Sequence, residues 1–222
     1  MPHFIRFSGI ATVALLAWSS GQAAALHALI TDRDRAPMAD TVLMLVPTDP
    51  SRDAAAAAPQ DAPQVMDQVK LQFNPQVMVV GKGGQVAFPN SDTVAHQVYS
   101  FSTPKRFSLG LYRGLPYAPV VFDQPGLVVL GCNIHDSMLG YVYVAESPYF
   151  GKSNERGEVH VADVPAGTYA IKAWGPRFKE QQAQVLQQVT LRGDETLDVT
   201  LKLDRMLSPL RNPAAKPGKL RY

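Results

Sequence analysis

The stretch that most constrains this chain is residues 129–144, with the sequence VLGCNIHDSMLGYVYV. Two runs of apolar, β-forming residues flank a short polar loop, so the pattern predicts two strands joined by a tight connection. The loop carries Cys132, His135 and Met138 at three-residue intervals. A thiolate and an imidazole, with a second imidazole in the plane and a weakly bound thioether, form the blue-copper geometry. The spacing therefore predicts a metal loop held between two strands.

The loop supplies three of these four groups, so the second imidazole has to come from elsewhere in the chain. His96 is the candidate, because it follows an expected strand at residues 85–88 and a polar run at residues 90–92. A simple surface histidine is the alternative interpretation of this residue.

Together, the strings GCNIHDSMLGYVYV and VAFPNSDTVAHQVYS resemble the cupredoxins, and the Cys-x2-His-x2-Met loop is similar in length to that of amicyanin. The wider sequence resembles bacterial periplasmic proteins of the methylamine utilization type. The resemblance covers residues 65–146 and implies a Greek-key sandwich with one type 1 copper ion. It implies that Cys132, His96 and His135 are equatorial ligands and that Met138 is the axial ligand.

By the same resemblance, Asn90 and Asp92 are candidates to support His96. A metal-ligating imidazole normally has its other ring nitrogen hydrogen-bonded, which fixes the orientation of the ring. Ordinary turn chemistry is the alternative, since Asn and Asp also satisfy their own backbone in loops. Gln97 stands where related sequences often carry a second His, which leaves no imidazole for a further metal contact there.

The first 25 residues have the composition of an export signal. A basic start with Arg6 precedes a short apolar run at residues 10–18 and small residues with a cleavage point near Ala23 or Ala25. An uncleaved membrane anchor is the alternative, but about 20 apolar residues are needed to cross a bilayer. We expect a periplasmic protein that has no membrane span after signal cleavage.

Cys132 is the only cysteine of the 222 residues. Exported proteins usually pair their cysteines, so an odd one is reactive, intermolecular or bound to a metal. Its position three residues before His135 favours a metal ligand over a buried structural cysteine, which is a common fate of this residue type.

The sequence on either side of the copper motif indicates a second sandwich. Residues 26–50 contain expected strands at 26–31 and 41–46, and residues 147–204 contain strands separated by Pro-Ala-Gly and Gly-Asp turns. Both parts resemble the carboxypeptidase-regulatory-like, or transthyretin-like, β-sandwich. Two strands alone cannot build a core, so the strand at 41–46 should lie in one sheet with strands from 158–203.

The resulting fold class is all-β: a cupredoxin Greek-key sandwich plus a smaller Ig/transthyretin-like β-sandwich. The cupredoxin domain, residues 65–146, is inserted into the discontinuous sandwich, as insertions succeed at exposed loop tips. Residues 51–64, rich in Ala, Pro and Asp, are expected to be a linker, and residues 205–222 a basic tail.

Aromatic residues are expected to fill the two cores. In the copper domain these residues are Tyr99, Phe101 and Phe107, together with Leu109. In the second sandwich, His160 and Trp174 are expected to be half-buried, and an exposed Trp174 would instead indicate a sugar or partner contact.

The composition limits the function. A net charge of +2, without a basic stripe that includes aromatic residues, gives no reason to expect nucleic acid. The resemblance implies a one-electron carrier whose partner is a periplasmic cytochrome or dehydrogenase. The alternative is a copper-binding or carbohydrate- or partner-binding scaffold without electron-transfer turnover.

An enzyme is not expected. A multicopper oxidase or nitrite reductase needs further histidines in paired motifs, and beyond the signal the chain holds only His27, His96, His135 and His160. Catalytic zinc on one Cys and two His is a further alternative, but the neighbouring Met favours a softer metal.

Overall fold

The structure is a computed structural model that describes residues 23–49, 62–178, 183–193 and 196–203. These residues form seventeen strands and no helix, so the prediction of an all-β chain is confirmed. Accordingly, nothing in these ranges forms a helix long and apolar enough to span a bilayer. Residues 1–22 of the expected export signal (1–25), most of the linker and the basic tail lie outside the described residues, whereas residues 23–25 belong to the first strand.

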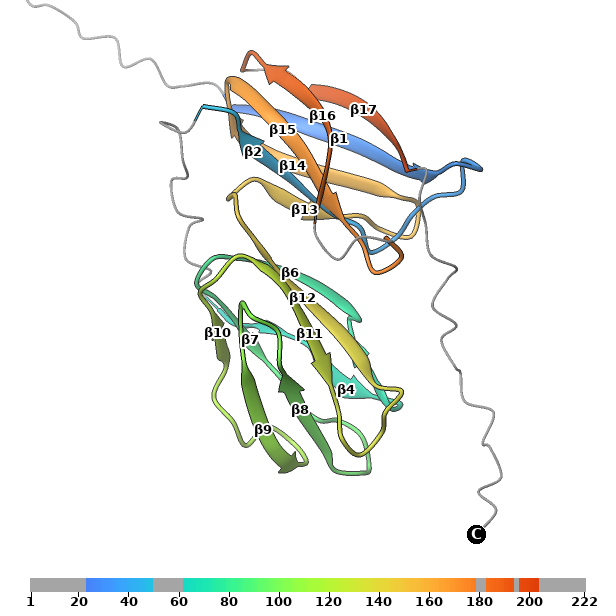
Figure 1. The fold of residues 1–222 in the computed structure, drawn as a ribbon, viewed down its shortest axis with the longest axis vertical. Helices are drawn as coiled ribbons and strands as arrows, with labels where there is room; N and C mark the ends of the chain where they lie inside the picture. Colours follow the sequence, from blue (N-terminus) through green and yellow to red (C-terminus); the bar gives the residue numbers. More distant parts are fainter. Residues whose placement is uncertain (1–22, 50–61, 179–182, 194–195, 204–222) are drawn as a thin grey trace, which may run out of the picture.

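The strands gather into two bodies (Figure 1). The upper body has two sheets, with strand orders β14-β1-β17 and β13-β2-β15-β16. Its strands are β1 (Ala23–Asp32), β2 (Val42–Pro47), β13 (Phe150–Lys152), β14 (Glu158–Pro165), β15 (Gly167–Trp174), β16 (Gln184–Leu191) and β17 (Thr196–Leu203). The inner faces of both sheets share one hydrophobic core, to which β1 contributes Leu26 and β15 contributes Ile171. This is a β-sandwich.

The early strand β2 pairs antiparallel with the late strand β15, with Leu45 opposite Ile171. The prediction that the strand at 41–46 lies in one sheet with strands from 158–203 is therefore confirmed. On the other sheet, β1 pairs antiparallel with β14 and parallel with β17. The exact domain boundaries remain a prediction.

The lower body contains a five-stranded sheet of order β6-β12-β11-β8-β9, a three-stranded sheet of order β10-β7-β3, and the hairpin β4-β5. Its strands are β3 (Gln64–Val65), β4 (Asp67–Val69), β5 (Gln72–Asn74), β6 (Val77–Gly81), β7 (Gly84–Ala87), β8 (His96–Ser100), β9 (Phe107–Tyr112), β10 (Val120–Phe122), β11 (Gly126–Gly131) and β12 (Leu139–Ala145). Its core draws on both larger sheets, with Leu130 from β11 and Phe122 from β10.

A third hydrophobic cluster joins the two bodies. The Trp174 ring, at the end of β15, lies 5.5 Å from the Tyr141 ring and 5.3 Å from the Tyr143 ring, both on β12. Met44 of β2 belongs to the same cluster, so β2 is buried on both of its faces. A bridge of 2.8 Å between Lys172 Nζ and Glu146 Oε1 adds a polar contact between the two bodies.

A turn with positive φ at Lys70 and Leu71 reverses the chain between β4 and β5. Three predictions about single side chains were wrong. Phe101 is 76% exposed, because the buried positions of β8 are His96, Val98 and Ser100, and the alternation of the strand puts Phe101 on the outer face. Trp174, expected to be half-buried, is only 2% exposed because β12 covers it, and His160 is exposed.

Candidate metal centre

The loop that carries the predicted ligands lies between two paired strands. Gly131, the last residue of β11, is opposite Leu139, the first residue of β12, so residues 132–138 form a closed connection. The Met138 amide donates to the His135 carbonyl at 2.9 Å, which tightens the turn. In Figure 1 this connection lies at the end of the lower body that is turned away from the upper body.

Two glycines allow aromatic rings to approach this loop. A Cβ at Gly131 would lie 2.8 Å from ring atoms of Tyr99, and a Cβ at Gly140 would lie 2.9 Å from the Phe73 ring. Phe73 is buried in the core, so it has little room to yield. The glycines at positions 131 and 140 therefore let the strands that position the ligands pack closely against these rings.

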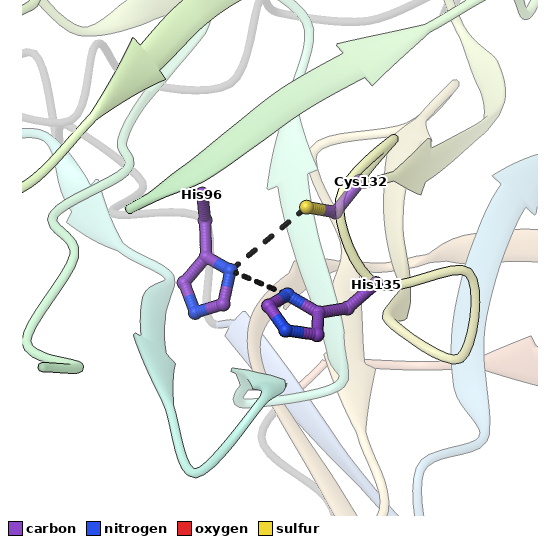
Figure 2. A group of neighbouring side chains, drawn as sticks. All are labelled: His96, Cys132 and His135. Atoms are coloured by element: carbon purple, nitrogen blue, oxygen red, sulfur yellow. Dashed lines mark hydrogen bonds between the residues drawn. The ribbon is translucent and has the colours of Figure 1, made fainter. Parts of the chain in front are cut away.

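Three of the predicted ligands converge (Figure 2). His96 Nδ1 lies 3.3 Å from His135 Nδ1 and 3.9 Å from Cys132 Sγ. One potential ligand atom from each of the three residues lies within 4.8 Å of those of the other two. His96 comes from the start of β8 and the other two come from the loop after β11, so two distant segments meet at one point.

The His96 ring is fully buried and its far side is held by a carboxylate. Its Nε2 atom lies 2.8 Å from Asp92 Oδ2. An ionised carboxylate can only accept, so in the neutral ring Nε2 carries the proton and Nδ1 presents a lone pair. That lone pair is on the nitrogen that faces Cys132 and His135. Asp92 therefore orients the imidazole in the way that metal-ligating histidines are usually oriented.

Asp92 is itself held by the turn between β4 and β5. Its carboxylate accepts hydrogen bonds from the amides of Lys70, at 2.6 Å, and Leu71, at 2.9 Å. Burial acts to raise the pKa of Asp92, but the hydrogen bonds from Leu71, His96 and Lys70 outweigh it and hold the pKa below its ordinary value. The group is thus ionised at neutral pH.

Asn90 has a different role from Asp92. Its side-chain amide donates to the carbonyls of Val94, at 3.0 Å, and Tyr112, at 2.8 Å, while its Oδ1 atom accepts from the Asp92 amide at 3.0 Å. These bonds fix the loop that leads into His96. Asn90 thus acts on the backbone, as turn chemistry predicts, and indirectly on the position of Asp92.

The sulfur of Cys132 is buried and has one backbone donor. The Gln97 amide lies 3.5 Å from Cys132 Sγ, and the Cys132 residue is 2% exposed. The Gln97 side chain accepts a hydrogen bond from the side chain of Asn133 at 2.9 Å and donates to Ser108 Oγ at 3.1 Å. In the sequence, Gln97 is notable only because it stands where related sequences often carry a His. The structure shows that its side chain joins β8 to β9 and to the loop.

Met138 is 1% exposed and lies in the same hydrophobic cluster as Cys132. A thioether that is buried next to apolar groups satisfies the chemistry of a weak axial ligand, since it needs no strong hydrogen bond. Its assignment as a ligand stays a prediction.

The donor set fits copper better than zinc or a hard cation. The cysteine sulfur and two imidazole nitrogens of the group are soft or borderline donors, as is the thioether of Met138 in the same loop, and no carboxylate belongs to the group of three. The carboxylate of Asp92 bonds instead to the far side of His96.

No model of a protein family matches the sequence, and no curated protein matches it either. Solved structures do match part of it. A copper-containing nitrite reductase from Thermus scotoductus is 25% identical over 45% of this chain, with a TM-score of 0.37. A purple cupredoxin from Nitrosopumilus maritimus is 19% identical over 37% of this chain, with a TM-score of 0.33. A reduced Cu(I) form of an amicyanin mutant is 21% identical over 46% of this chain, with a TM-score of 0.35.

The matched region spans 27% of the nitrite reductase chain, 99% of the purple cupredoxin and 98% of the amicyanin. The chain thus matches cupredoxins along part of its length.

Proposed function

We propose that this chain is a one-electron carrier of the cupredoxin type that holds one type 1 copper ion. His96, Cys132 and His135 would hold the ion, with the thioether of Met138 as a further, weak ligand. The observation that carries the proposal is the convergence of His96 Nδ1, His135 Nδ1 and Cys132 Sγ from two separate segments. When bound, copper would supply a reversible one-electron couple.

The residues around the three donors support a carrier. Gln97 and Asn133 join the loop to β8, Asp92 holds the His96 ring, and the Gly131–Leu139 pair closes the loop. Ligands held by rigid elements move little, so these side chains would shift little between the two oxidation states of the copper. Burial of the Cys132 sulfur also keeps water away from it, which limits oxidation of the thiolate.

His135 offers the route to the surface. It is half-buried, whereas His96 is completely buried, and the adjacent Ile134 is 51% exposed. We propose that electrons pass through the exposed edge of the His135 ring and that a periplasmic cytochrome or dehydrogenase docks there. The export signal and the periplasmic location belong to this proposal, as does the insertion of the copper domain into the second sandwich.

A spectrum of the copper-loaded protein tests the proposal. We expect an intense thiolate-to-Cu(II) absorption band that disappears on reduction and returns on oxidation. The conservative change Cys132→Ser should abolish the band, because the oxygen cannot supply the thiolate. The zinc-loaded wild-type protein is the control and should show no visible band, since zinc has no redox chemistry.

Two results would contradict this proposal. A wild-type protein that binds Cu(I) but gives no band with Cu(II) would support the storage or delivery alternative. A band that persists in Cys132→Ser would place the copper at another site.

A further inference from the structure

Two His and one Asp, side chains of types that can ligate metals, lie in a row on the upper body, outside the copper loop of residues 132–138. His27 is on β1, His160 is on β14 and Asp198 is on β17, and the strand order is β14-β1-β17. The register places His27 opposite both His160 and Asp198. Residues paired in this way project from the same face of a sheet. The row therefore crosses the whole sheet with His27 at its centre.

This row is on the solvent face. Leu26 and Ala28, the neighbours of His27 in β1, are buried in the core, so the alternation of the strand turns His27 outward. The His27 side chain is 51% exposed and that of Asp198 is 85% exposed. Neither group is needed for packing.

His27 lies close to each of the other two side chains. The rings of His27 and His160 have centroids 4.4 Å apart at an angle of 65°, and His27 Nδ1 lies 3.7 Å from Asp198 Oδ1. They line a depression of about 530 Å³, whose rim includes Asn154 and Glu158. The Glu158 carboxylate accepts hydrogen bonds from the side chains of Asn154 and Arg156, which hold it at the turn before β14.

We propose that His27, His160 and Asp198 form a second metal site, for a divalent transition-metal ion. Two imidazoles and one carboxylate are borderline donors that suit Cu(II), Zn(II) or Ni(II), and Cu(II) binds most strongly in that series. His27 would be the central ligand. His160 and Asp198, which flank it on the two outer strands, would reach the ion by rotation of exposed side chains.

This site differs from the copper loop in kind. It lacks sulfur, so it gives no preference for Cu(I), and its donors are open to water, so the ion exchanges readily. The upper body would thus hold a labile divalent ion, independently of whether the loop carries electrons.

Metal titration of the mature chain tests this site. The loop is first filled with copper, excess metal is removed, and Cu(II) is added while the heat of binding and the electron paramagnetic resonance spectrum are recorded. We expect one further equivalent with a tetragonal spectrum that shows coupling to imidazole nitrogen. If the loop fails to bind copper, the same His-dependent equivalent should still appear, which separates the two proposals.

Variants decide whether these residues hold the ion. His27→Gln and His160→Gln should each weaken the further equivalent by roughly tenfold or more, and Asp198→Asn by a smaller factor. The control Asp34→Asn removes an exposed carboxylate elsewhere, beside Arg33, and should change nothing. Loss in His160→Gln separates this site from a chelate of His27 with a chain amino terminus.

All four changes are on the surface, and thermal unfolding checks that each variant is folded. Absence of a further equivalent in the wild type, or equal binding by wild type and both His variants, would overturn the proposal.

Discussion

Two histidine pairs in this chain have nearly the same ring geometry in very different surroundings. His96 and His135 have ring centroids 5.0 Å apart at 68°, and His27 and His160 have centroids 4.4 Å apart at 65°. The first pair has a buried thiol beside it, and the second has an exposed carboxylate. Both pairs bring together residues from segments far apart in the sequence.

The two pairs differ in their third group and in their burial, and these features, more than the imidazoles, would decide which metal chemistry each pair supports. Next to Cys132 and out of water, a histidine pair suits a tightly held ion with a redox couple. Next to Asp198 and in water, it suits an ion that exchanges. The carboxylate partner differs in the same way, because Asp92 is only 14% exposed and Asp198 is 85% exposed.

The largest expected effect separates the two pairs. His96→Ala should abolish the thiolate-to-Cu(II) band and weaken binding of the first copper equivalent by more than the roughly 10–100-fold that supporting residues contribute. His27→Ala should leave that band intact and remove only the second equivalent. Absorption spectra and calorimetry of both variants check this reciprocal pattern, and loss of the band in both would show that the pairs are not independent.

The contact between the two bodies gives the next largest effect. Trp174→Ala removes a ring that is 2% exposed and packed on two tyrosines, so it should lower the free energy of unfolding by about 3–5 kcal/mol. Phe101→Ala is the matched control, because that ring is exposed and its loss should cost less than about 0.5 kcal/mol. Urea unfolding of the metal-free proteins measures both.

The copper band should survive in Trp174→Ala, since both histidine pairs lie outside the cluster of this ring. A band that changes would mean that the upper body supports the copper loop.

The sequence was sufficient for features that depend on local patterns. Apolar runs bounded by turns predicted the strands around the copper loop, and the three-residue spacing of its ligands identified Cys132 and His135 as neighbours. Asp92 was a candidate because of its position before His96, and the structure shows the contact.

Features that depend on long-range register were out of reach. His27 and His160 meet because β1 pairs with β14, and no local pattern encodes that register. The burial of Trp174 depends on which strand of the lower body covers it, and the contacts of Gln97 depend on how β8 lies against the loop. Phe101 is exposed because His96, Val98 and Ser100 are the inward positions of β8, and the sequence alone does not show which face of a strand is turned to the core.

A smaller effect should follow when the carboxylates of Asp92 and Asp198 are replaced by amides. Asp92→Asn keeps the shape but removes the charge that favours the higher oxidation state, so the reduction potential should rise and copper affinity should fall by about 10–100-fold. Asp198→Asn should leave the potential unchanged. Protein-film voltammetry measures the reduction potential of both variants. An unchanged potential in Asp92→Asn would mean that Asp92 only holds the His96 ring in place.

The smallest effect is expected where the loop is joined to β8 by exposed side chains. Asn133→Ala removes the 2.9 Å hydrogen bond to Gln97, which should cost about 0.5–1.5 kcal/mol of stability at most because water replaces part of it. Thr168→Val removes a comparable exposed bond to Thr190 in the upper body. Of these two changes, only Asn133→Ala should speed the release of copper to a chelator. The bond between Asn133 and Gln97 restrains the loop between Cys132 and His135, whereas the bond between Thr168 and Thr190 does not touch that loop. Equal release from both variants would mean that the Gly131–Leu139 pair and the buried Met138 are sufficient to hold the loop.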